Sequence, residues 1–204
     1  MNARSIALTS GLSLMLLACS IGQPVQQPTT YVVEPDAPAQ RLSGLHGSEV
    51  VRMGNVRVAA AFAGNALVYR TDDVTFVSDP YQSFIADPRA MLGNQMASWL
   101  NRAGPFKVVT QPDSGLPADY ILEATVTELY GDFRPGQPAA AVMTVQFTLI
   151  NNDAVGAGRM FEQTITRRAP LERSSPDALV RGYGRAVSEI LADVAGELAM
   201  KKLK

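Results

Sequence analysis

Two segments of the chain carry apolar residues at the three- and four-residue spacing of an amphipathic helix. In the first, Asp87 is a suitable N-cap, Pro88 suits the first helical position, and Gly104-Pro105 is a suitable end. In the second, Ser175 and Pro176 play the same two roles at the start. The apolar stripes are Met91, Leu92, Met96, Trp99, Leu100 and Ala103, and Leu179, Tyr183, Val187, Ile190, Leu191, Val194 and Leu198. Each predicted helix therefore needs a surface to cover.

Alternation of apolar and polar positions predicts strands in the rest of the domain. The clearest alternation runs through 141–149, and with 120–127 and 160–168 it predicts an antiparallel meander. Shorter strands are predicted at 56–62, 66–71, 74–77 and 106–110, with 66–71 returning from 56–62 as a hairpin. The predicted fold is α+β, a mostly antiparallel sheet of about six strands with two helices packed on one face.

The segment 78–86 shows no regular period, yet it carries three large apolar residues, Tyr81, Phe84 and Ile85. Loops run over the surface and often carry function, so these residues are candidate contacts for a protein partner. The alternative is that all three fold back and plug the end of the core.

The N-terminal segment has the pattern of an export signal. Arg4 precedes an uncharged apolar run at 6–17, which is shorter than the roughly 20 residues that a membrane-spanning helix needs. The run ends in Leu16-Leu17-Ala18-Cys19, which resembles the bacterial lipobox. That resemblance implies a signal peptide at 1–18 and lipidation of Cys19. Ser20, where an Asp would mark inner-membrane retention, implies sorting to the outer membrane.

The residues after the cysteine are rich in Pro, Gln and Gly and have no sustained period, so 19–48 is predicted as a lipidated tether and 49–204 as the domain. Within this tether, 31–33 fits a short strand that docks on the domain. His46 is expected to be a solvated loop residue rather than a base or a ligand.

Composition removes most catalytic classes. The chain has one cysteine and one histidine, which excludes Cys-cluster and multi-His metal sites and a disulfide framework. Its formal net charge of −1 argues against general nucleic-acid binding. Asp72-Asp73 suit a turn better than a pair of catalytic carboxylates, and no phosphate loop or nucleophile elbow occurs. We therefore expect no enzymatic activity, no cofactor and no metal.

The lipobox, the strand ALVYR (66–70), the helix ending in Trp99-Leu100 and the strand at 118–133 together resemble the ABC-type transport auxiliary lipoproteins, the PqiC-like partners of MCE-protein lipid transporters. The resemblance implies a non-enzymatic periplasmic subunit, anchored in the outer membrane, that docks on an MCE-domain protein. Phospholipid or another hydrophobic substrate would be the cargo. A structural or assembly lipoprotein of another outer-membrane complex is the alternative function, and an atypical periplasmic hydrolase is a third. The sequence leaves the direction of transport and the oligomeric state open.

Overall fold

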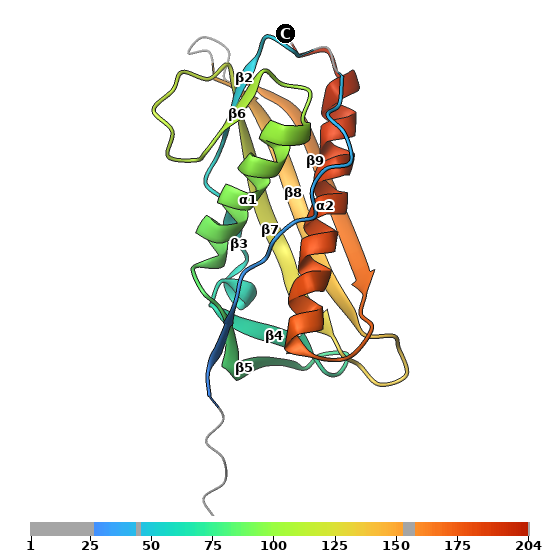
Figure 1. The fold of residues 1–204 in the computed structure, drawn as a ribbon. Helices are drawn as coiled ribbons and strands as arrows, with labels where there is room; N and C mark the ends of the chain where they lie inside the picture. The colour runs from blue at the N-terminus through green and yellow to red at the C-terminus, as the bar shows by residue number, and fades with distance from the viewer. Residues whose placement is uncertain (1–26, 44–45, 153–157, 204) are drawn as a thin grey trace, which may run out of the picture.

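The computed structural model describes residues 27–43, 46–152 and 158–203 (Figure 1). The predicted signal peptide at 1–18, Cys19 and the first part of the predicted tether lie outside the described residues.

The described chain forms one nine-stranded sheet, with two long helices lying on the same face of it (Figure 1). The predicted α+β class and the placement of both helices are confirmed. The strands are β1 (Thr29–Tyr31), β2 (Val50–Met53), β3 (Arg57–Val58), β4 (Ala66–Arg70), β5 (Phe76–Phe84), β6 (Val108–Thr110), β7 (Tyr120–Asp132), β8 (Ala140–Asn151) and β9 (Arg159–Pro170). The helices are α1 (Pro88–Ala103) and α2 (Pro176–Met200), and Ala60–Phe62 form a short 3₁₀ turn.

Strand β7 is the axis of the sheet. Along one edge it pairs with β8 over its whole length, and β8 then pairs with β9, so the predicted antiparallel meander is confirmed. Along the other edge it pairs in parallel with β2, β3 and β4 in turn, near Tyr120, Thr125 and Gly131. The strands β6, β5 and β1 extend the sheet beyond these short strands. Residues far apart in the sequence are therefore held together through β7.

The prediction of a mostly antiparallel sheet of about six strands is wrong. Five of the eight strand pairings are parallel. The predicted hairpin between 56–62 and 66–71 does not form, because the chain turns through the 3₁₀ segment and β4 pairs with β5 and β7 instead. A period of two identifies a strand but carries no information about its partner or its direction.

Both helices begin where the sequence predicts. The carboxylate of Asp87 accepts a hydrogen bond from the Arg89 amide at the start of α1, and the Ser175 hydroxyl accepts one from the Ala178 amide at the start of α2. The predicted stripe of α2 is buried along its whole length, and Tyr183 and Ile190 are fully enclosed. The core lies between this helix layer and the sheet.

Residues 29–42 form a strap that crosses the helix layer (Figure 1). The strap begins as β1, which pairs with β5, so a short docking strand is present as predicted for 31–33, but it lies two residues earlier, at Thr29–Tyr31. Val33 is fully buried in the main core. The Asp36 carbonyl accepts hydrogen bonds from the Trp99 indole of α1 at 2.9 Å and from the Ser188 hydroxyl of α2 at 3.4 Å. Part of the segment predicted as a tether (19–48) is therefore packed on the domain, and backbone carbonyl groups make several of its contacts.

His46 was expected in solvent, but it is buried. Its Nε2 lies 2.6 Å from the Lys201 carbonyl oxygen, and its ring stacks on Phe106 at 5.7 Å between centroids. A carbonyl oxygen can only accept, so Nε2 carries the hydrogen in this bond. His46, which follows the strap in the sequence, thus connects this part of the chain to the C-terminal end of α2 and has a structural role.

The strap lies so close to α2 that one position must be glycine. A Cβ built on Gly184 would lie 2.4 Å from the Glu34 carbonyl oxygen. A Cβ on Gly196, in the same helix, would meet no atom within 4 Å. Glycine in a helix interior lowers the free energy of unfolding. At Gly184 the close packing of the strap offsets this loss, whereas at Gly196 no neighbouring segment does.

We expect Gly184→Ala and Gly196→Ala to change stability in opposite directions. Gly184→Ala should lower the free energy of unfolding by about 1–3 kcal/mol, because rigid backbone must move away from the new methyl group. Gly196→Ala should raise it by up to about 1 kcal/mol through helix propensity. Urea titration of both variants measures this, and equal effects of the two changes would contradict the close approach of the strap.

Candidate functional surface

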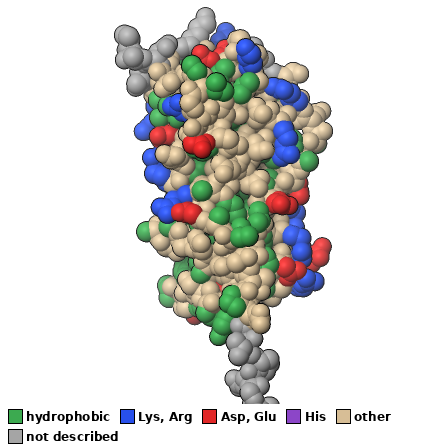
Figure 2. Space-filling view, turned by 60° about the vertical axis from the view of Figure 1, so that its left-hand side comes forward, with side chains coloured by type: hydrophobic (Ala, Val, Ile, Leu, Met, Phe, Trp, Pro, Cys, Tyr) green, Lys and Arg blue, Asp and Glu red, His purple; other side chains and the backbone are tan. Residues whose placement is uncertain are grey.

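Large apolar side chains reach the surface mainly at one end of the molecule. Five of them lie on β5 or directly beside it, and we refer to this set as the apolar end: Val74, Phe76, Val77, Tyr81 and Ile85. Val74 is 87% exposed and Ile85 is 62% exposed. Green side chains are visible at the lower end in Figure 2. Monomeric soluble proteins rarely leave such a cluster exposed without a function.

An aromatic cluster on the sheet face away from the helices supports the apolar end. The ring of Phe76 lies edge-on to Tyr130, with 5.2 Å between centroids, and 6.0 Å from Phe62. Val68 and Val142 complete the buried part of this second core. The exposed side of Phe76 is therefore held in place from beneath rather than being free to collapse.

Of the three residues predicted as partner contacts, two are presented to solvent and one is not. Tyr81 is 41% exposed and Ile85 protrudes further, whereas Phe84 is 3% exposed and packs against Tyr183 at 6.2 Å between centroids. Phe84 is therefore not a surface contact for a partner. Its ring instead fills the end of the core, as the alternative prediction held. The segment is also not irregular, since β5 runs through it to Phe84. The alternation of apolar and polar residues does not predict this strand, because β5 is exposed on both faces and bends in the middle.

The bend in β5 is fixed by Asp79. Its Oδ1 accepts hydrogen bonds from the backbone amides of Tyr81 and Gln82 at 2.8 and 3.0 Å, and its Oδ2 accepts one from the Tyr69 hydroxyl at 2.7 Å. Burial and the bond to this carboxylate raise the pKa of the Tyr69 phenol, so Tyr69 stays a donor at neutral pH. Asp79 thereby sets the direction in which Tyr81 points.

A buried carboxylate joins three further segments at the same end. The side chain of Asp132, at the end of β7, is fully enclosed and forms ion pairs with Arg134 at 2.9 Å and with Arg168 of β9 at 2.5 Å. The hydrogen bonds from Arg134 and Arg168 hold the pKa of Asp132 well below its usual range. Arg134 also contacts the exposed Asp73 of the β4–β5 turn at 2.9 Å. The sequence gives no signal of this cluster, because Asp73 and Arg168 lie far along the chain from Asp132 and Arg134.

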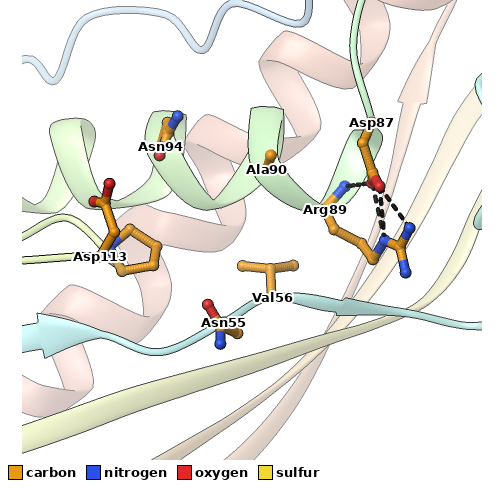
Figure 3. A pocket seen from close by; sticks show the side chains of 8 residues that line it. Asn55, Val56, Asp87, Arg89, Ala90, Asn94 and Asp113 are labelled. Atoms are coloured by element: carbon orange, nitrogen blue, oxygen red, sulfur yellow. Dashed lines mark hydrogen bonds and ion pairs between the residues drawn. The ribbon is translucent and has the colours of Figure 1, made fainter.

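A hollow of about 410 Å³ lies between the start of α1 and β3 (Figure 3). Val56 forms its floor beneath Ala90, and Asp87 points to Arg89 at one end (Figure 3). The hydrogen bonds from the side chain and backbone of Arg89 lower the pKa of Asp87, so this carboxylate does not act as a proton donor near neutral pH. The hollow brings together no nucleophile with a base to activate it.

A neighbouring hollow of about 560 Å³ is lined by Arg57 and Glu123, which form an ion pair at 3.1 Å. Within the described residues, no three His, Cys, Asp or Glu side chains come close enough to hold a metal ion. None of the helices in the described part of the chain is both long and apolar enough to cross a membrane. The apolar end is therefore the strongest candidate for a functional surface.

Truncation of two neighbouring residues separates the core from the surface. Phe84→Ala should lower the free energy of unfolding by about 3–5 kcal/mol, because it opens a cavity against Tyr183. Ile85→Ala should change it by no more than about 0.5 kcal/mol, because that side chain is in solvent. Thermal or urea unfolding of the two variants measures the difference. A stable Phe84→Ala variant would show that Phe84 is not the plug.

The buried ion cluster should show a distinct pH dependence. Asp132→Asn should cost about 1–3 kcal/mol at pH 7, because two guanidinium groups lose their shared counter-charge. The pKa of Asp132 is lower in the folded than in the unfolded chain, so its contribution is complete above the ordinary carboxyl value of 3.8 and is lost as the pH falls below it. The deficit of the variant relative to wild type should therefore shrink in acid.

Asp73→Asn is the matched control, because Asp73 is 83% exposed and contacts the same Arg134. It should cost no more than about 1 kcal/mol. Equal losses for the two variants at pH 7, measured by urea titration, would contradict the assignment of Asp132 as the central charge.

The fold is shared with solved structures of low sequence identity. Protein XCC0632 from Xanthomonas campestris has a TM-score of 0.66 at 16% identity, over 85% of this chain and 93% of that one. An uncharacterized protein has a TM-score of 0.65 at 19% identity, over 84% and 99%. The hypothetical protein CT253 from Chlamydia trachomatis has 0.51 at 14% identity, over 73% and 96%. At these identities the likeness establishes the fold alone.

No curated protein matches the chain. The protein family described as ABC-type transport auxiliary lipoprotein component matches residues 31–195. That range starts in the strap and ends within α2, so it includes α1, most of α2 and the whole apolar end. With a match over more than half of its length, the chain belongs to the ABC-type transport auxiliary lipoprotein family.

Proposed function

We propose that the chain is an outer-membrane-anchored periplasmic lipoprotein that serves as a non-catalytic accessory subunit of an MCE-type ABC transport system. The system would move phospholipid or another hydrophobic substrate across the cell envelope. The observation that carries the proposal is the family match over residues 31–195, downstream of a lipobox at 16–19.

The proposed anchor is a lipid on Cys19, the single cysteine of the chain. Each buried methylene of an acyl chain contributes about 0.8 kcal/mol, so several chains together form a durable anchor. Ser20 lacks the charge that marks inner-membrane retention, which supports sorting to the outer membrane.

A non-catalytic role is supported by how the reactive side chains are used. His46 is the single histidine, and its Nε2 is bonded to a backbone carbonyl. Asp87 caps a helix and pairs with Arg89, and Asp132 pairs with two arginines. Each of these groups is engaged in contacts that stabilise the fold.

The proposed partner is an MCE-domain protein of the transport system. An accessory subunit fixed to the outer membrane can assist an inner-membrane ATPase and permease only through a protein that reaches across the periplasm. A tag after Lys204 is suitable for recovering such a partner, because the C-terminus lies at the end opposite to the strap's start (Figure 1).

The experiment is crosslinking in cells, followed by affinity purification of the lipidated chain and mass spectrometry. We expect an MCE-domain protein together with its ATPase and permease. Recovery of a secretion or lipopolysaccharide assembly complex in their place would contradict the proposal and favour the structural role.

Two neighbouring variants separate anchoring from sorting. Cys19→Ser should abolish labelling with a radioactive fatty acid, block maturation and reduce recovery of the partner, because the thiol carries the lipid. Ser20→Asp should keep the label but move the protein to the inner membrane. Normal labelling of the Cys19→Ser variant would contradict the assignment of the anchor.

A further inference from the structure

The apolar end lies beside the start of the strap, from which the chain leads back to the proposed lipid anchor. The strap's first strand pairs with β5, with Thr29 opposite Gln82 in parallel register, so the strap begins next to β5 (Figure 1). Cys19 precedes Thr29 by ten residues. Ten extended residues span at most about 35 Å. A lipid on Cys19 would therefore keep the start of the strap, beside β5, within about 35 Å of the membrane surface.

The shape of the apolar end is unlike a flat protein-binding patch. Phe76 lies on the sheet face away from the helices, in contact with Tyr130, and the next residue, Val77, points to the opposite face, since strand side chains alternate. Val74 projects from the turn before them. Apolar groups thus surround the β4–β5 hairpin on both faces and at its tip. A lipid phase contacts such a protrusion on all sides, whereas a protein surface contacts one.

The part of β5 before Gln82, which β1 leaves uncovered, is also poorly suited to pairing with another strand. Pro80 has no amide hydrogen, and the amides of Tyr81 and Gln82 already donate to Asp79. Edge strands that carry proline and internally bonded amides resist strand addition. This argues against recognition of a peptide by β-sheet extension at the same place.

The basic side chains at this end each have polar partners, while the Asp72 carboxylate accepts a hydrogen bond from the Asp73 amide rather than pairing with a basic group. Arg134 bridges Asp73 and Asp132, and the Arg70 guanidinium donates to the carbonyl oxygens of Asp72 and Asp73. No unpaired basic cluster is present here among the described residues that could attract anionic lipid. Contact with a membrane would therefore depend on apolar side chains and would need no negative lipid headgroup.

We propose that the apolar end is a lipid-contact surface that inserts Val74 and its neighbours into the periplasmic face of the membrane that holds the anchor. Tyr81 and Ile85, expected from the sequence to touch a protein partner, are assigned to lipid contact. The proposal rests on the lipid anchor of the proposed function and not on the identity of the transport partner. It would fix the orientation of the domain, with α1, α2 and the sheet standing upright on the membrane.

The test uses the full lipidated protein in vesicles of phosphatidylethanolamine and phosphatidylcholine. Because Cys19 is the single cysteine and its thiol is consumed by lipid, one introduced cysteine can carry an environment-sensitive fluorophore. Val74→Cys places it at the apolar end. Leu116→Cys and Met200→Cys are matched controls at exposed apolar positions outside the apolar end.

The fluorophore at residue 74 should shift to shorter wavelength and be quenched by spin-labelled lipid, and neither effect should change with salt. The control positions should show neither effect. Emission at residue 74 that equals the controls in vesicle-bound protein would overturn the proposal. So would a shift that requires a second copy of the chain or the transport partner, because it would assign the surface to protein. Absence of the protein from the vesicles would instead show that the anchor itself is wrong.

Discussion

The docking of the strap between the two helices is the contact on which the rest of the structure depends. The Asp36 carbonyl accepts hydrogen bonds from α1 and α2 together, and Gly184 allows the strap backbone to come close enough for this. The same strap buries Val33 and pairs with β5. A segment with the composition of a tether is thus part of the domain, and the chain that leads to the proposed anchor is joined rigidly to the core.

Local signals in the sequence were sufficient for the helices and for the longest strands. Asp87 and Ser175 each combine a capping oxygen with a following proline, and the stripe of α2 has one consistent face. Strand pairing was not predictable in the same way. The four residues of β2 are too few to show a period, and the alternation at 56–62 corresponds to a strand of only two residues, β3. The parallel register of both strands on β7 depends on contacts with residues about 70 positions away.

The candidate surface was predicted in part. Tyr81 and Ile85 were found because large apolar residues in a segment without a period are unusual, and both reach the surface. Phe84 is also a large apolar residue, but its side chain faces the core. The pairing of β5 with β4 shifts register between Ser78 and Ser83, where Asp79 bends the strand, so the regular alternation of side chains does not extend to Phe84. Phe76 and Val77 were assigned to an ordinary strand, and no sequence signal shows that this strand lies at the open edge of the sheet. The proposed lipid-contact surface follows only from the pairing of the strap with the same strand, at Gln82–Phe84.

The most direct test of rigid strap docking is the exchange rate of the Trp99 indole hydrogen with solvent, measured by NMR on the ¹⁵N-labelled full-length protein. Trp99 is the single tryptophan, so its indole signal is unambiguous, and its partner is the strap carbonyl of Asp36 at 2.9 Å. The account predicts exchange as slow as that of the buried amides of α1 and α2. An indole hydrogen that exchanges as fast as one in free solution would show that the strap is not docked, and would contradict the account.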